Sequence, residues 1–357
     1  MPIVITDADV RRHLSMRECI DAMRVCFGDL ADGRAVSLPR LRYRVPSGVP
    51  DRSYFANVHV GAVPSYGVAC VRAGSHLMVD SSLAQGRRSK RNAEPVNWTV
   101  IILYDISTAE PIAFLHESQL SGMRVAATTA VAMEEIARPE VSVMGLLGSG
   151  RQARSHLAAI ATVRPIREVR VHSPNAEHLA AFVDEARVNH PGIDVRAVAD
   201  ARAAVEGADI VCSNTNSLNP VVHGAWLVPG QVVITIGNTD AAGRKTEVDD
   251  EVFRRADRVV VNHWASVEAD RQVELLDAIR DGRVRREDVH ELGDLVTGRA
   301  RVRSTPDTIV YYKSNTGLAM QFAAAGAIVA RNMAAAGGDT DKVIPRAWLG
   351  GDLYQIG

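Results

Sequence analysis

The sequence predicts an α/β protein with a doubly wound parallel sheet and a second, α+β domain, and at this point it leaves open whether one domain is inserted into the other. The length of 357 residues exceeds one ordinary hydrophobic core and favours two domains. Beyond about residue 120, short apolar strand-like runs alternate with helical runs, which is typical of a parallel sheet covered on both faces. Before that point, runs at 53–61, 66–74 and 97–105 are rich in β-branched and aromatic residues, which indicates a mainly antiparallel sheet.

Composition and charge argue against several classes of protein. Hydrophobic residues make up 46% of the chain, charged residues 23%, and the net charge is -1, so we expect neither a disordered chain nor a nucleic-acid partner. No C-x-x-C pair occurs among Cys19, Cys26, Cys70 and Cys212, which predicts reduced thiols and no metal site. The start lacks a signal-peptide pattern and no apolar run could cross a bilayer, so we expect a cytoplasmic protein without a membrane partner.

The remaining elements follow from hydrophobic periodicity and from start and stop signals. Ser15 precedes a helix with apolar residues at three-and-four spacing, and Gly33 stops it. Further helices are expected at 121–137, 151–163, 175–189, 201–208, 249–256 and 318–338, and strands at 141–148, 168–173, 194–200, 209–215, 231–237 and 257–263. The helix at 318–338 fits either the flank of the parallel sheet or a return into the first domain. The polar, basic run at 80–95 predicts an exposed loop.

A glycine-rich turn joins the strand at 141–148 to the helix at 151–163 with the spacing G-x-G-x-x-A. Gly148 permits a tight turn, Gly150 permits backbone to approach a pyrophosphate, and Ala153 lets the helix pack close to the strand. The helix start supplies N–H donors and a positive dipole end. The strand before and the helix after give this motif its required context, so we predict a Rossmann-type dinucleotide site that also includes Arg151 and Gln152.

The end of the second strand bears on the choice of cofactor. An NAD-selective site usually places Asp or Glu there to bind the ribose hydroxyls. This chain has Ser173, Pro174 and Asn175 instead, which offer neutral and N–H donors to a 2′-phosphate and favour NADP over NAD. In the plainer alternative, which is compatible with either cofactor, Ser173 caps a helix that has Pro174 at its first position.

Polar residues also follow the strand at 209–215. Ser213, Asn214 and Thr215 lie where a doubly wound sheet places its ligands, so we expect them at the cofactor, although turn formers occur there too.

Several segments together resemble the ornithine cyclodeaminase/mu-crystallin family, and the similarity covers nearly the whole chain. They are PRLRYR near residue 40, SGMRVAATTAVA, GLLGSGRQARSHL, ADIVCSNTNSLNPVV, IGNTDAAGRKTEVD and YYKSNTGLAMQFAAA. The resemblance implies a homodimer in which residues 1–122 and 317–357 form a substrate-binding and dimerisation domain around a Rossmann domain at 123–316. It also implies hydride exchange between a nicotinamide and the α-carbon of a small amino or imino acid.

The resemblance assigns roles to individual residues. Arg124 matches the family arginine that binds the substrate carboxylate, for which a planar guanidinium is suited. Arg40 matches a second such arginine, although Arg42 and Arg44 are open alternatives because the register of a strand here is uncertain. Asp240, after the strand at 231–237, matches the aspartate near the substrate nitrogen, where a carboxylate can stabilise positive charge and transfer a proton.

The family motif YYKSNTG supplies two further expected site residues. Gly317 would permit close backbone approach to the substrate, and Ser314 would bind the carboxamide of the cofactor or cap the next helix.

The chain departs from the family pattern at two places. Arg72 stands where many members carry a lysine, and arginine can orient and polarise a substrate but is a poor general acid. Asp240, a water molecule or His76 would then supply the proton. The sequence also reads Met320-Gln321-Phe322 where members often carry an aspartate, which predicts an altered pocket, and a larger apolar substrate if Phe322 faces it.

These residues favour an NAD(P)H-dependent imine reductase or amino-acid dehydrogenase, with NADP preferred and Arg72 and Asp240 at the reacting atoms. One alternative is an ornithine-type cyclodeaminase, which releases ammonia and recycles NAD. The other is a binding protein of the mu-crystallin kind that holds NADPH and a small molecule with little turnover. Reduction ranks above cyclisation because the family lysine and the later aspartate are both replaced.

Overall fold

The computed structural model describes residues 2–80, 97–215, 217–237, 246–314, 317–337 and 343–344. Within these ranges the chain divides into two compact units. The first unit takes its residues from Met1–Leu77, Ala93–Arg124 and Leu318–Gly357, and the second from Met78–Asn92 and Val125–Gly317. The chain thus leaves the first unit within one helix and returns to it at the start of another.

The first unit contains a mainly antiparallel sheet with the strand order β1-β7-β6-β5-β4-β2, and β3 pairs with β4. Its strands are β1 Ile3–Ile5, β2 Val36–Ser37, β3 Leu41–Pro46, β4 Arg52–Val63, β5 Val68–Val79, β6 Asn97–Asp105 and β7 Pro111–His116. In this first-unit sheet, β1 and β7 pair in parallel. The three predicted runs correspond to β4, β5 and β6, so the predicted antiparallel sheet is confirmed.

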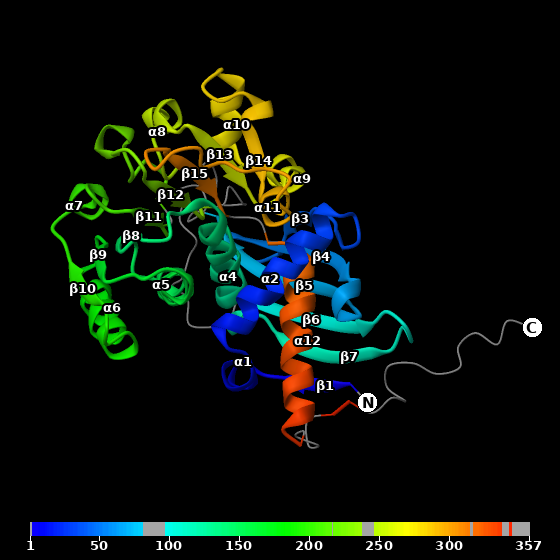
Figure 1. Cartoon of the computed structure of the whole chain (residues 1–357). Helices are drawn as coiled ribbons and strands as arrows, with labels where there is room; N and C mark the ends of the chain where they lie inside the picture. The colour runs from blue at the N-terminus through cyan, green and yellow to red at the C-terminus, as the bar shows by residue number, and fades with distance from the viewer. Residues whose placement is uncertain are drawn as a thin grey trace, which may run out of the picture. The chain divides into compact units, whose positions relative to one another are not determined.

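Helices of the first unit cover this sheet (Figure 1). They are α1 Asp7–His13, α2 Met16–Ala31, the first turns of α4 Ser118–Ile136, and α12 Ala319–Ala335. Ser15 caps α2 as predicted, in a reciprocal capping box with Glu18. The long helix α12 packs against α2 and β4, so it returns to the first domain. Gly326 permits its close approach to the sheet, because a Cβ there would lie 2.8 Å from Leu103 Cδ1.

The second unit contains a parallel sheet with the strand order β10-β9-β8-β11-β12-β15-β13-β14. The strands are β8 Val143–Leu147, β9 Glu168–His172, β10 Asp194–Ala197, β11 Ile210–Ser213, β12 Val232–Thr235, β13 Arg258–Val261, β14 Val289–Glu291 and β15 Val310–Lys313. From β8 the chain first builds outward through β9 and β10, then crosses to β11 on the other side. A doubly wound sheet binds dinucleotides at such a reversal of strand order.

Helices connect these strands and bury their apolar residues on both faces. They are α5 Arg151–Val163, α6 Ala176–Asn189, α7 Ala201–Val205, α8 Asp250–Arg255, α9 Trp264–Ala269, α10 Val273–Arg280 and α11 Leu292–Val296. Side chains of α7, α8 and α10 share one core with Leu147, Val211 and Val233. The alternate residues Leu146, Cys212 and Ile234 are equally buried, so the opposite face is covered too.

Strand β15 differs from the sequence-based expectation. It lies in the sheet between β12 and β13, yet its residues had been interpreted only as part of a turn motif. The apolar run at 309–312 is short and leads directly into the charged Lys313, which is buried as an ion pair, so the length signal of a buried strand is weak. Helices α9 to α11 and strand β14 were missed as well, since each spans eight residues or fewer.

Candidate functional site

The glycine-rich turn adopts the backbone that its sequence predicts. Gly148, directly after β8, has a φ of 98°, and a Cβ there would lie 2.5 Å from the carbonyl oxygen of Asn214. Its N–H donates to the carbonyl of His172 at 2.8 Å, which ties the turn to the end of β9. No described atom lies within 4 Å of a Cβ built on Gly150. The first glycine is therefore required by the fold, and the second leaves room for a ligand.

The start of α5 fits a bound pyrophosphate. Its N-cap is Gly150, which offers no side chain to the first N–H groups of the helix. By contrast, side chains cap α1, α2 and α6. Arg151 opens the helix and is exposed, whereas Ala153 is fully buried against the sheet, as the motif requires. Uncapped N–H groups beside open space suit an anionic diphosphate.

The turn after β9 shows that the helix cap considered at Ser173 is wrong. Asn175 caps α6, since its side chain accepts a hydrogen bond from His178 N at 2.8 Å. Ser173 is therefore not the helix cap, because the helix begins two residues later than that alternative required. Instead, Ser173 Oγ accepts a hydrogen bond from Ser149 Oγ in the glycine turn at 3.0 Å. Ser173 thus lies at the dinucleotide turn, and it carries no negative charge.

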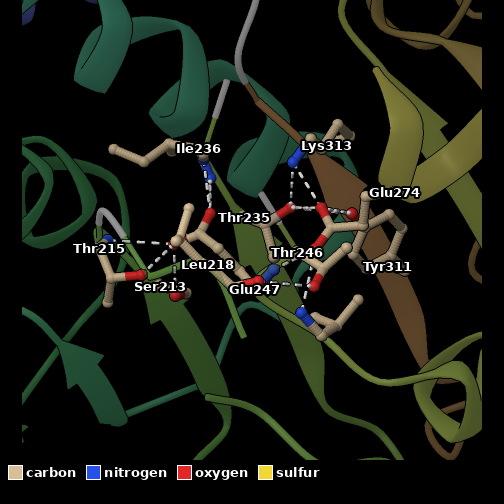
Figure 2. A network of polar contacts seen from close by, with 12 residues as sticks. Ser213, Thr215, Leu218, Thr235, Ile236, Thr246, Glu247, Glu274, Tyr311 and Lys313 are labelled. Carbon is tan, nitrogen blue, oxygen red and sulfur yellow. Dashed lines mark hydrogen bonds and ion pairs between the residues drawn. The ribbon is translucent and has the colours of Figure 1, made fainter. Parts of the chain in front are cut away.

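Two of the residues expected at the cofactor donate hydrogen bonds to a carboxylate of the protein. Ser213 and Thr215 donate their hydroxyls to Glu247 Oε1 at 2.7 and 2.9 Å (Figure 2). Asn214, between them, donates from Nδ2 to Cys212 Sγ at 3.1 Å, and its Oδ1 is buried with no hydrogen-bond partner among the described residues. Sequence reasoning missed Glu247, because nothing local links it to strand β11.

A hydrogen-bonded chain connects the glycine turn with the end of β15. Burial lowers the pKa of His156 to about 4, so its ring is neutral at physiological pH. Its Nδ1 lies 2.8 Å from the carbonyl of Gln152, which requires a proton on Nδ1 and leaves Nε2 to accept from Thr129 at 3.1 Å. Ser314 Oγ lies 2.8 Å from Thr129 Oγ1, and either hydroxyl can donate. Ser314 is fully buried and is hydrogen-bonded within the second unit.

Buried arginines gather in the first unit. Arg124 is 7% exposed and donates to Gln321 Oε1 at 2.9 Å. Burial, together with the charges of Arg72 and Arg40, lowers the pKa of Arg124 to about 9, although the charge of Glu117 opposes the shift. Arg40 thus lies within electrostatic reach of Arg124.

Arg72 is oriented by two partners that the sequence did not reveal. It donates to Asn57 Oδ1 and to Glu117 Oε2. Burial would raise the pKa of Glu117, but the charges of Arg72 and Arg124 outweigh burial and lower it, so Glu117 is ionised. The Phe322 ring is fully buried, with its centroid 4.6 Å from Arg124 Cζ and 5.9 Å from Arg72 Cζ.

Other predicted residues fall outside these two groups. Asp240 and most of the loop predicted at 80–95 lie outside the described residues. Gly317 is described and buried, in the segment between β15 and α12. Among the described residues, no three His, Cys, Asp or Glu side chains gather as metal ligands. In the same ranges, no helix has the length and apolar character to cross a membrane.

A pair of alanine substitutions separates the two glycine roles. We expect Gly148→Ala to cost about 1–3 kcal/mol of stability, because it combines a positive φ with a backbone clash. Gly150→Ala should leave stability within about 0.5 kcal/mol and weaken NADPH binding about tenfold or more, since its methyl would meet only the ligand. Chemical denaturation and fluorescence titration measure both. Unchanged NADPH affinity in Gly150→Ala would contradict the assignment of this turn.

Comparisons with known proteins agree with this fold and these motifs. The chain is 28% identical over 259 residues to an NAD(P)H-dependent anabolic L-arginine dehydrogenase of Pseudomonas aeruginosa, which covers 72% of this chain and 74% of the relative. It is 31% identical over 224 residues to an N-((2S)-2-amino-2-carboxyethyl)-L-glutamate dehydrogenase of Staphylococcus aureus, over 62% of this chain and 64% of that protein.

A solved structure shares the fold. The Δ(1)-pyrroline-2-carboxylate reductase of Thermococcus litoralis, solved with NADH and L-proline, superposes with a TM-score of 0.81 at 24% identity, over 95% of this chain and 99% of the other. The sequence model of the ornithine cyclodeaminase/mu-crystallin family matches residues 1–337. The chain therefore belongs to the ornithine cyclodeaminase/mu-crystallin family.

Proposed function

We propose that this protein is an NADPH-preferring reductase or dehydrogenase that acts at the α-carbon of an imino or amino acid. The observation that carries the proposal is the group of buried arginines in the first unit. Arg124 and Arg72 are both about nine-tenths buried, and Arg40 lies within electrostatic reach. Burying such charge costs free energy that a bound carboxylate would offset.

The replaced residues favour imine reduction over cyclodeamination. Gln321 is neutral where many family members carry an aspartate, so this partner of Arg124 adds no negative charge. Arg72 donates to Glu117, and a guanidinium is a poor general acid, so Arg72 would orient a substrate rather than transfer a proton. A nicotinamide, when bound, supplies the hydride for the imine carbon. We assign the proton that the nitrogen must gain to Asp240.

The arrangement also supports further proposals about assembly. We infer a homodimer, as expected from the family, because the first-unit sheet exposes large apolar side chains to solvent. They are Val36, Leu41, Tyr43, Val45, Trp98 and Val100. We also infer a cytoplasmic protein, since the four cysteines are free and buried, which suits a reducing compartment. We propose no nucleic-acid or membrane partner.

The central experiment is a substrate panel monitored at the nicotinamide absorbance in both directions. We expect NADPH oxidation with cyclic ketimines or with keto acids plus amines, and NADP reduction with some amino acids. Ammonia release without net NADH accumulation would identify a cyclodeaminase instead. Tight NADPH binding without turnover across the whole panel would identify a binding protein.

The proposed role of Arg124 predicts that kcat/KM falls when this arginine is replaced and is unchanged when an arginine elsewhere is replaced. Arg124→Met should lower kcat/KM about 100-fold, because it removes the buried cation that would pair with the substrate carboxylate. Arg17→Met on α2 is the matched control, since Arg17 is half-exposed and pairs at 3.9 Å with Asp21. We expect the control to retain wild-type kinetics. Equal kinetics for the two variants would refute a carboxylate-binding role for Arg124.

Cofactor choice can be tested at the end of β9. Since Ser173 and Asn175 leave this turn without a carboxylate, we expect NADPH to be preferred over NADH. Ser173→Asp would place a negative charge there, which should reverse the ratio of kcat/KM values about tenfold or more. The new carboxylate can still accept the bond from Ser149. A wild-type protein that prefers NADH tenfold would contradict the proposal.

A further inference from the structure

Glu247 is a buried carboxylate at the ends of two neighbouring strands. It is 1% exposed, and its side chain accepts five hydrogen bonds from donors at the carboxyl ends of β11 and β12 (Figure 2). Its Oε1 accepts from Ser213 Oγ, Thr215 N and Thr215 Oγ1, at 2.7, 3.0 and 2.9 Å. Its Oε2 accepts from the main-chain N–H groups of Ile236 and Gly237, at 3.0 and 2.5 Å.

This set of donors requires a carboxylate and not an amide. Hydroxyl groups can rotate to accept a hydrogen bond, but the N–H groups of Thr215, Ile236 and Gly237 cannot. At least one such N–H faces each oxygen of Glu247, so the NH₂ of a glutamine would meet a backbone N–H in either orientation. Glu247→Gln thus preserves the size and shape of the side chain, but it removes the hydrogen bonding to the main chain at one of the two strand ends.

The backbone of Glu247 is itself held in place. Its N–H donates to Glu274 Oε1 at 2.5 Å, and the adjacent Val248 donates to the same oxygen at 3.0 Å. The other oxygen of Glu274 pairs with Lys313 and accepts from Tyr311 at 2.9 Å. Glu247 therefore extends from a fixed point to the ends of β11 and β12, and it couples them to β15.

The location of these ends gives Glu247 a functional meaning. In a doubly wound sheet, one half binds the adenosine part of a dinucleotide and the other half binds the nicotinamide part. The glycine turn with Gly148 and Gly150 belongs to the half formed by β8, β9 and β10. The strand ends that Glu247 holds belong to the half with β11 and β12. A group that fixes those ends would act mainly on the nicotinamide part of the ligand.

We propose that Glu247 is a positioning residue that holds the carboxyl ends of β11 and β12 in the shape required by the nicotinamide half of the cofactor. The inference rests on the proposed function for its cofactor. Ser213 and Thr215 then serve as links between Glu247 and strand β11, and they need no direct contact with the cofactor.

The test compares two ligands that differ only in the nicotinamide part. NADPH and 2′-phospho-ADP-ribose are titrated against the full-length wild-type and Glu247→Gln proteins by calorimetry. We expect the Kd for NADPH to rise about tenfold or more while the Kd for 2′-phospho-ADP-ribose stays within about twofold. General loosening of the fold would weaken both ligands alike, so equal factors would overturn the proposal, as would two unchanged affinities.

Three variants make the comparison decisive. Glu251→Gln removes an exposed carboxylate of α8 that pairs with Arg254, and both affinities should match the wild type. Gly150→Ala should weaken both ligands, since each contains the pyrophosphate. If Glu247→Gln does not fold, Ser213→Ala removes one donor from Oε1 at a fully buried position and should show the same selectivity at about threefold. Equal weakening of the two ligands by Ser213→Ala would overturn the proposal.

These measurements are independent of catalysis. A wild-type protein that binds NADPH but turns over nothing in the substrate panel contradicts the proposed function, while the ratio of the two affinities still decides the role of Glu247.

Discussion

The desolvation of two carboxylates constrains the centre of the second unit. Glu247 and Glu274 are at most 5% exposed, and an ionised carboxyl group removed from water must recover its hydrogen bonds within the protein. Burial raises the pKa of Glu247, and the charge of Lys313 opposes it. For Glu274, the ion pair with Lys313 outweighs burial and lowers the pKa. The ends of β11, β12 and β15 therefore have to meet at these acids, because a displaced strand would leave a buried charge unmatched.

Two buried arginines, Arg72 and Arg124, lie in the first unit. Glu117 orients Arg72, but Arg124 donates to Gln321, whose amide oxygen contributes no charge. In the second unit, donors are matched to carboxylates already present. The same physical rule, that buried charge needs a partner, explains the carboxylate contacts of the second unit and underlies the carboxylate-binding role proposed for the first. The neutral Gln321 beside Arg124 therefore matters to the net charge of this group as much as the arginines do.

Local features of the sequence predicted most of the fold. The capping box at Ser15, the alternation of strands and helices, and the turn at Gly148 each depend on residues within a few positions of one another. Partners that are distant in sequence could not be predicted. Glu247 bonds to a serine 34 residues away, and Arg124 bonds to a glutamine 197 residues away. No periodicity connects such positions, so their pairing emerges only when the sheet and helices are assembled.

Residues at strand ends show why a motif alone assigns roles incompletely. Ser213 and Thr215 occupy positions where a doubly wound sheet binds its ligand, and short polar side chains there are typical of direct cofactor contacts. The sequence also permits a second role, in which the hydroxyls stabilise the turn that receives the ligand. Each hydroxyl has one hydrogen to donate and Glu247 receives both, so these bonds support the second role, which is the one proposed above. Of the three expected residues, Asn214 alone retains a buried side-chain oxygen with no hydrogen-bond partner among the described residues.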